Sequence, residues 1–298
     1  MNEAWRDELL ARHRIGPVDE LGHGGEAVVY ALDADRVLRV HRHEAADYVR
    51  RIGELYGALD RSAVPYALPE VLEVHGDGEV SWSIERRLEG RPFDVLLRHL
   101  EGADRERALT AYLEGAAAFR ALGPPRGWTG GCEELFTEEH LRADRWGDLL
   151  AGRLALQLER ARPTLEAALD DPDAAAAPIL AEARAEEADL VTLVHGDWFP
   201  GNVLLDDDLQ VSAAIDLGWL TVVGSADHDI LSAAVFCEVR PTHRDTDGAV
   251  LEAAVIRHLG ADGAEALART RRYEQLRFAF VTEDEHLHRW CIEGLRAP

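Results

Sequence analysis

Lysine is absent from the 298-residue sequence, and arginine alone supplies its 32 basic side chains. The P-loop that binds nucleotide phosphates in many enzymes requires a lysine, so this absence excludes that motif. A phosphate site in this chain must therefore use arginine. Its guanidinium stays charged and can bind phosphate or carboxylate through two parallel hydrogen bonds.

Cysteine and long apolar runs are also scarce. The three cysteines, Cys132, Cys237 and Cys291, are too few and too widely spaced to predict a disulfide framework or a zinc site. No run approaches the roughly 18 uncharged apolar residues that span a bilayer. The first residues lack the basic and apolar regions of a signal peptide. We therefore expect a cytoplasmic protein without a membrane partner.

Acidic residues outnumber basic ones, with 56 acidic side chains and a formal net charge of −24. Such a surface repels a phosphate backbone, so nucleic acid is not expected as a partner. The hydrophobic fraction of 47% is ordinary for a protein with a real core, and the length allows one large or two modest domains. The composition does not predict an oligomeric state.

One segment combines a histidine, two carboxylates and an asparagine at fixed spacing. The sequence His195-Gly196-Asp197 follows an apolar run, Asn202 precedes a second run, and Asp216 follows a third. These runs predict short buried strands, which places the polar side chains on tight connections. Oxygen side chains held in this way can bind Mg²⁺ beside a spare carboxylate. Phosphoryl transfer needs that combination, because a metal bridges the phosphates and a base orients the attacking hydroxyl.

This segment resembles the catalytic and metal loops of the aminoglycoside phosphotransferase and choline kinase-like family, in its antibiotic phosphotransferase branch. The resemblance implies that Asp197 is the catalytic base and that Asn202 and Asp216 bind Mg²⁺. Gly196 stands where protein kinases have an arginine that binds a phosphorylated activation loop, so switching of that kind is not expected. A metal-dependent phosphatase is an alternative, but such enzymes need a histidine directly after the asparagine, where this chain has Val203.

A glycine-rich turn near the N-terminus precedes a predicted hairpin, with strands over residues 27–30 and 36–40. Glycine there lets backbone N–H groups approach phosphate oxygens. In the resembled family the return strand bears the cation that grips the nucleotide phosphates, usually a lysine, and here it bears arginine. The candidates for binding ATP or GTP are therefore Gly22, His23, Gly24, Gly25 and Arg39. Because Arg39 replaces the usual lysine, an inactive kinase-like module that binds a nucleotide remains an alternative.

Apolar residues recur at helical spacing from Ala45 to Leu59 and predict one helix. In the resembled family this helix supplies a glutamate that pairs with the phosphate-gripping cation. Glu54 is the candidate for that role and Glu44 is the alternative.

A second hairpin is predicted over residues 71–74 and 80–85, and a hinge follows it. The resemblance adds two residues of this region, Glu85 and Leu88, to the nucleotide-binding candidates. It implies an α+β, protein-kinase-like bilobal fold, in which a small antiparallel-sheet N-lobe with one helix joins a larger, mainly helical C-lobe. We place the N-lobe at residues 1–89. The C-lobe, at 90–298, holds the catalytic loop, the metal site and the acceptor pocket. Helices are expected there over residues 94–122, 141–169, 174–190, 226–238, 245–259 and 264–290, the last of them broken.

The acceptor is expected to be an antibiotic of the aminoglycoside, macrolide, peptide or nucleoside type. A tryptophan-bearing stretch over residues 127–134 precedes a long helical insertion, and acceptor pockets in the resembled family are built from such insertions. The candidates for lining the pocket are Glu133, Glu134, Asp144, Trp146, Asp148, Asp197, Trp198, Glu283, Asp284, Glu285 and Trp290. A kinase of a primary metabolite such as a sugar, choline or homoserine remains the alternative.

Overall fold

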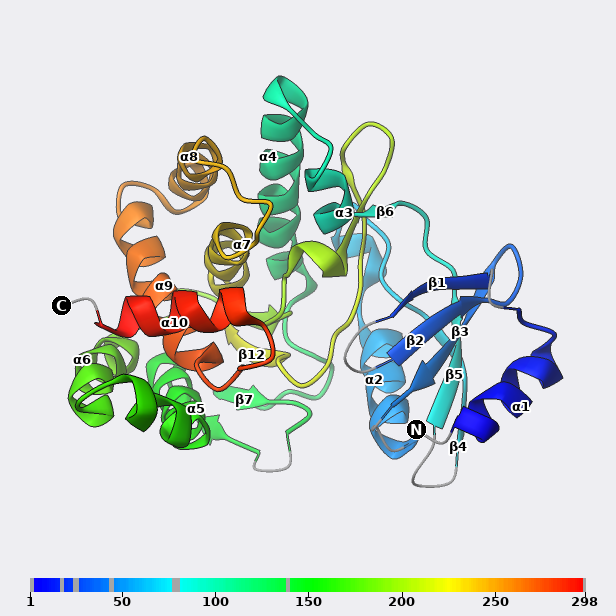
Figure 1. The fold of residues 1–298 in the computed structure, drawn as a ribbon, viewed down its shortest axis with the longest axis horizontal. Coiled ribbons are helices and arrows are strands. Elements are labelled where there is room, and N and C mark those ends of the chain that lie inside the picture. The colour runs from blue at the N-terminus through cyan, green and yellow to red at the C-terminus, as the bar shows by residue number, and fades with distance from the viewer. Residues whose placement is uncertain are drawn as a thin grey trace.

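The computed structural model describes residues 3–16, 19–23, 27–42, 46–76, 81–137 and 140–296. A small N-terminal part built on one sheet stands beside a larger part made mainly of helices (Figure 1). This is the division that the sequence predicted. No helix within the described residues is long and apolar enough to cross a membrane.

Five antiparallel strands form the N-terminal sheet, in the order β1-β2-β3-β5-β4. They are β1 (Glu20–His23), β2 (Ala27–Ala31), β3 (Arg36–His41), β4 (Val71–Gly76) and β5 (Ser81–Arg86). The pairs β2–β3 and β4–β5 are the two predicted hairpins, and the structure confirms both. Because side chains alternate along a strand, the sheet has two faces of different composition.

The outer face of this sheet is apolar and is covered by a helix that was not predicted, α1 (Glu3–His13). Leu9 of α1 packs there with buried side chains of the strands, namely Val28, Tyr30, Leu38, Val40 and Ile84. The inner face instead carries the polar side chains of Arg39, His41, Ser83 and Glu85. The inner face is therefore the one that has the chemistry for a nucleotide.

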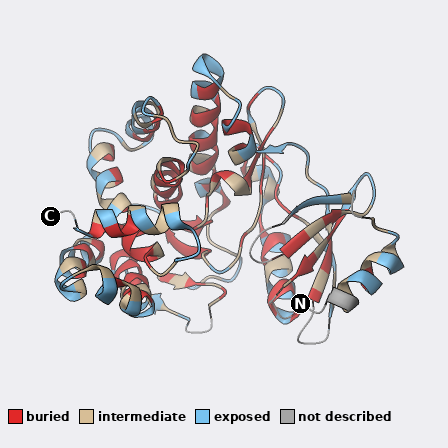
Figure 2. Cartoon of the chain, in the orientation of Figure 1, coloured by how far each residue is buried: buried red, intermediate tan, exposed pale blue. Residues whose placement is uncertain are grey.

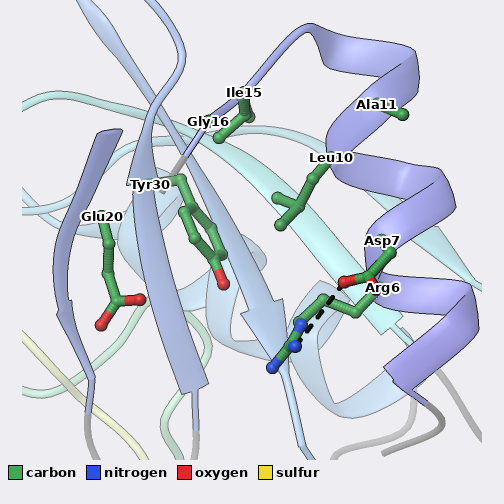
Figure 3. A pocket seen from close by; sticks show the side chains of 8 residues that line it. All are labelled: Arg6, Asp7, Leu10, Ala11, Ile15, Gly16, Glu20 and Tyr30. Carbon is green, nitrogen blue, oxygen red and sulfur yellow. Dashed lines mark ion pairs between the residues drawn. The ribbon is translucent and has the colours of Figure 1, made fainter. Parts of the chain in front are cut away.

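A cleft of about 370 Å³ opens on the outer face between α1 and strands β1 and β2 (Figure 3). Arg6 and Leu10 reach into it from α1, and Tyr30 reaches into it from β2. Val29 pairs with Arg39 across the sheet, so Tyr30, the next residue along, points to the opposite side from Arg39. This cleft is therefore separate from the inner face.

Helix α2 (Ala46–Ala58) confirms the helix predicted from apolar spacing. It lies between the sheet and the helical part (Figure 1), and its buried residues include Tyr48, Val49, Leu55 and Tyr56. Ala45, which begins the predicted helix, and Glu44, the alternative candidate for pairing with Arg39, lie outside the described residues.

The larger part contains the predicted helices with shifted ends. The helices are α3 (Phe93–Leu97), α4 (Gly102–Phe119), α5 (Trp146–Ala168), α6 (Pro172–Ala185), α7 (His228–Glu238), α8 (Asp247–Leu259), α9 (Gly263–Phe278) and α10 (Glu285–Arg296).

Three differences from the predicted helices have local causes. The single helix expected over 94–122 is split into α3 and α4, because Glu101 is extended and Gly102 has a left-handed φ of 51°. Helix α5 begins at Trp146 instead of 141, because Arg142 and Ala143 form strand β8. Helix α6 ends at Ala185 instead of 190, since the next residue is extended.

Two small sheets hold the segment around His195. One contains β6 (Arg91–Pro92), β10 (Val203–Leu205) and β11 (Val211–Ala214). The other contains β7 (Cys132–Glu134), β8, β9 (Val191–Val194) and β12 (Val222–Ser225). Buried residues fill the space between these sheets and the surrounding helices (Figure 2). The connections between the strands are thereby fixed to a packed core.

The segment between β5 and β6 joins the two parts and contains the expected hinge. Ser212 donates from Oγ to the Glu89 carbonyl at 2.7 Å, which fixes the end of this segment to β11. Gly90 follows with φ of 120°, and a side chain there would overlap Ser212. The boundary after residue 89 falls in this segment and stays a prediction.

Candidate active site

The pairing of two strands and one side-chain hydrogen bond bring Asp197, Asn202 and Asp216 together. Asn202 ends a single 3-10 turn (Pro200–Asn202), directly before β10, and Asp216 is the second residue after β11. Because β10 and β11 are paired, the Ile215 backbone N–H donates to the Asn202 carbonyl at 2.9 Å. The Asn202 amide also donates from Nδ2 to Oδ2 of Asp197 at 3.0 Å. The three predicted site residues therefore form one cluster.

Asp216 faces the N-terminal sheet, where it pairs with Arg39 of β3. Asp216 has φ of 74°, a left-handed conformation that is uncommon outside glycine and is found at functional sites. Burial raises the pKa of its carboxyl, but the Arg39 guanidinium outweighs that effect and holds the pKa below its usual value. Asp216 is therefore ionised at neutral pH, as a metal ligand must be.

Asp197 has the opposite shift. Burial raises the pKa of its carboxyl to about 6, against the nearby positive charge of Arg277 and with the help of the negative charge of Asp216. A carboxyl with this pKa is largely ionised at pH 7 and is still basic enough to accept a proton there. This property fits the role of base that the sequence predicted.

The loop before Asp197 is held by buried hydrogen bonds. Asp229, at the start of α7, accepts from the backbone N–H groups of His195 at 2.8 Å and Gly196 at 2.9 Å. The ring of His195 donates from Nε2 to the Ile215 carbonyl at 2.9 Å, which ties this loop to the one that carries Asp216. Gly196 has φ of 76°, and a Cβ there would overlap the Leu220 carbonyl. Only glycine fits this position.

A buried ion pair lies behind the same loop. Arg277 of α9 donates from Nη2 to the Gly196 carbonyl at 2.8 Å and from Nη1 to both carboxylate oxygens of Glu274, at 3.1 Å each. The sequence analysis missed Asp229, Glu274 and Arg277. Their only signal in the sequence is that charged residues occur among the apolar positions of two predicted helices.

Helix α2 contacts the loop that carries Asp216 through two tyrosines. The Tyr56 hydroxyl accepts from the Leu217 backbone N–H at 2.9 Å. Tyr48 stacks on Trp219 with ring centroids 4.4 Å apart. The position of α2 is thereby linked to the position of Asp216.

The nucleotide candidates divide into groups. Gly22 of β1 pairs with Val29, and Val29 pairs with Arg39, so Gly22 and Arg39 lie in one row on the inner face. His23 lies in β1 beside Gly22. Gly24 and Gly25 lie outside the described residues.

The structure does not bring Glu54 to Arg39. Glu54 is exposed on α2, and Arg39 pairs instead with Asp216. The charge of Glu85, on β5, also acts on Arg39 and helps to raise its pKa. Leu88 is half-buried in the segment that follows β5.

Two of the three tryptophans expected to line an acceptor pocket belong to the core. Trp198 is fully buried. Its carbonyl accepts from the Tyr112 hydroxyl, and its indole N–H donates to the Tyr112 carbonyl at 3.3 Å. Trp146 is buried against Gly224, where a side chain would overlap its ring. Neither ring can line an open pocket. Trp290 is half-buried between two apolar clusters.

The acidic candidates for the acceptor pocket differ in exposure. Glu134 is buried in an ion pair with Arg153 at 2.8 Å, so it is a structural residue. Glu133 is half-buried and lies 3.8 Å from Arg142. Apart from Asp197, the remaining acidic candidates are exposed: Asp144 and Asp148 beside the start of α5, and Glu283, Asp284 and Glu285 at the start of α10.

The oxygen atoms in the cluster fit a hard divalent cation. Asn202 directs Nδ2 at Asp197, which leaves its Oδ1 as the atom suited to a metal, and Asp216 supplies an ionised carboxylate. No group of three His, Cys, Asp or Glu side chains that could hold a metal occurs among the described residues. Mg²⁺ often takes one or two protein oxygens and completes its shell with phosphates and water, so this small set is sufficient.

Several solved structures are similar to this chain over nearly its whole length. The ADP-bound aminoglycoside phosphotransferase APH(2'')-Ib aligns with a TM-score of 0.65 and 16% identity, covering 99% of this chain and 97% of that one. The gentamicin complex of APH(2'')-IIa aligns with a TM-score of 0.66 and 16% identity, covering 100% and 97%. The macrolide 2'-phosphotransferase MphH from Brachybacterium faecium aligns with a TM-score of 0.57 and 16% identity, covering 98% and 97%.

These similarities confirm the predicted α+β, kinase-like bilobal fold. No individual curated protein matches the chain in sequence. The model of one family, described as the phosphotransferase enzyme family, matches residues 18–273. The match spans most of the chain and contains the whole cluster at Asp197, so the protein belongs to the phosphotransferase enzyme family.

Proposed function

We propose that the protein transfers the terminal phosphoryl group of ATP or GTP, with Mg²⁺, to a hydroxyl of a small molecule. The observation that carries this proposal is the cluster of Asp197, Asn202 and Asp216, which faces Arg39 of the N-terminal sheet. A base, two metal ligands and a phosphate-binding cation are the parts that phosphoryl transfer needs.

Each residue has a distinct task in this reaction. Asp197 accepts the proton of the acceptor hydroxyl as the new O–P bond forms and the bond to the leaving nucleoside diphosphate breaks. Asn202 and Asp216 would hold Mg²⁺, which neutralises charge on the phosphates when bound. Arg39 and the backbone of the glycine-rich turn hold the phosphates in line with the acceptor.

For the acceptor we propose an antibiotic, in keeping with the interpretation of the sequence. Support comes from the similarity in fold to proteins named as aminoglycoside and macrolide phosphotransferases. The exposed acidic run at Glu283, Asp284 and Glu285 is available for the amines of such a compound.

The test is a panel of antibiotics and metabolic alcohols incubated with ATP or GTP and Mg²⁺, with a mass gain of one phosphoryl group as the readout. Asp197→Ala should abolish transfer while the Kd of the nucleotide stays unchanged. Arg39→Ala should chiefly weaken nucleotide binding. An unchanged Kd for the nucleotide would mean that another residue binds the phosphates. Full transfer by Asp197→Ala would refute the role of Asp197 as base.

A further inference from the structure

The inner side of helix α2 presents no carboxylate among its described residues. The buried residues of this side are Ala46, Tyr48, Val49, Leu55 and Tyr56. The two acids of the helix, Asp47 and Glu54, are exposed, and Asp47 pairs with Arg50 on the same helix. The described residues of α2 therefore supply no counter-charge for Arg39.

Strand β5 places a carboxylate beside Arg39. Arg39 pairs with Ser83 across the sheet, and Glu85 is two residues further along β5, so all three side chains lie on the inner face. Diagonal neighbours of this kind are within reach of long side chains. The Glu85 charge acts on Arg39 together with that of Asp216.

Glu85 is held in place by its neighbours on the same face. The Ser83 hydroxyl donates to Oε1 of Glu85 at 2.7 Å, so it must accept from Nε2 of His41, which lies 3.2 Å away. Ser83 and His41 are both buried, and burial lowers the pKa of His41 to about 3, so its ring is neutral. The chain from His41 through Ser83 to Glu85 therefore carries one charge, the carboxylate of Glu85.

Arg39 has donor capacity beyond its pair with Asp216. That pair uses Nη2, while Nε is buried without a hydrogen-bond partner among the described residues. If Asp216 takes Mg²⁺, as the proposed function requires, its charge is shared with the metal. A part-buried guanidinium that loses this counter-charge is destabilised. The Glu85 carboxylate acts on the same guanidinium and supplies a charge that the metal does not share.

We propose that Glu85 is the positioning residue for Arg39, held by Ser83 and His41, and that it keeps the guanidinium aimed at the nucleotide phosphates when Asp216 binds Mg²⁺. The inference rests on the proposed function, because it assigns Arg39 to the phosphates. It assigns to a strand of the sheet the role for which the sequence suggests Glu54, with Glu44 as the alternative, and Glu44 lies outside the described residues. A strand carboxylate is fixed by the sheet itself, so this support does not depend on the position of α2.

The test is the affinity of the full-length chain for ATP with Mg²⁺, measured by titration calorimetry. Glu85→Gln keeps the size of the side chain but removes its charge, and the Kd should rise about 10-fold to 100-fold. The KM for the nucleotide should rise by the same factor, with a much smaller change in kcat. Glu54→Gln is the matched control, since Glu54 is exposed, and its Kd should stay within about two-fold of the wild-type value.

A double-variant cycle separates positioning from general damage to the fold. In the Arg39→Ala background, Glu85→Gln should change the Kd by less than about two-fold, because no guanidinium remains to be positioned. An equal loss in both backgrounds overturns the proposal, as does a Glu85→Gln Kd equal to that of the wild type. If Glu85→Gln does not fold, Ser83→Ala replaces it, and an unchanged Kd in that variant has the same meaning.

The outcomes also distinguish this inference from the proposed function. A wild-type chain that binds neither ATP nor GTP with Mg²⁺ overturns both. A wild-type chain that binds and transfers, together with a Glu85→Gln variant that binds equally well, overturns only the role of Glu85.

Discussion

Replacing Asp197 by asparagine should make the protein more stable at neutral pH while removing its activity. Burial raises the pKa of this carboxyl from 3.8 to about 6, so the fold penalises the ionised form. A carboxyl whose pKa is raised by folding stabilises the fold most at pH values below its pKa in the unfolded chain. It loses that stabilisation as the pH rises through its pKa in the folded chain, here about 6. Asparagine keeps the shape of the side chain and does not titrate.

The size of the effect follows from the two pKa values. A rise from 3.8 to about 6 corresponds to about 3 kcal/mol in total, at roughly 1.4 kcal/mol for each pH unit. Most of the total falls below pH 5, and about 1 kcal/mol is expected between pH 5 and pH 7. The free energy of unfolding of Asp197→Asn minus that of the wild type should therefore increase by about 1 kcal/mol from pH 5 to pH 7.

Urea unfolding followed by tryptophan fluorescence measures this difference, without nucleotide or Mg²⁺. The exposed Asp207→Asn is the matched control and should show no comparable trend with pH. The same carboxyl should give kcat/KM an acid limb near pH 6, because the free enzyme needs Asp197 ionised. A stability difference that does not change between pH 5 and pH 7 would refute the raised pKa of Asp197.

Three other substitutions test how the loop at Asp197 is held. Gly196→Ala should abolish activity or folding, because its methyl group would overlap a backbone carbonyl, whereas Gly57→Ala, with open space around it, should leave Tm unchanged or higher. Asp229→Ala should lower the free energy of unfolding by about 2–4 kcal/mol, since two buried N–H groups lose their acceptor, and urea unfolding measures this loss. Arg277→Met should destabilise the protein by about 3–5 kcal/mol; it should also raise the pKa of Asp197, so that the acid limb of kcat/KM moves to higher pH.

Much of the site could be predicted because its residues are close together in the sequence. Asp197 and Asn202 lie on one connection, between β9 and β10, and the pairing of β10 with β11 brings Asp216 close to Asn202. The hairpin that carries Arg39 is likewise a local structure, with glycine and turn residues at its ends. Side-chain chemistry then restricts what such a cluster can bind.

Burial was harder to predict than chemistry. Trp146 and Trp198 stand in polar stretches of sequence, yet each fills a space between helices and strands that are distant along the chain. The same is true of Glu134, which is buried and pairs there with Arg153 of α5. The exposure of a side chain depends on how the helices and strands pack together, so the sequence of one strand or helix does not determine it.

The sequence by itself determined the kind of chemistry, since the spacing of a base and two metal ligands on neighbouring turns needs no distant contact. Only the tertiary structure decided which charges meet. Arg39 pairs with Asp216 across 177 residues and lies beside Glu85 instead of Glu54. Such pairs are set by how the sheet and the helices pack, because only packing fixes which face of each element is turned toward the site.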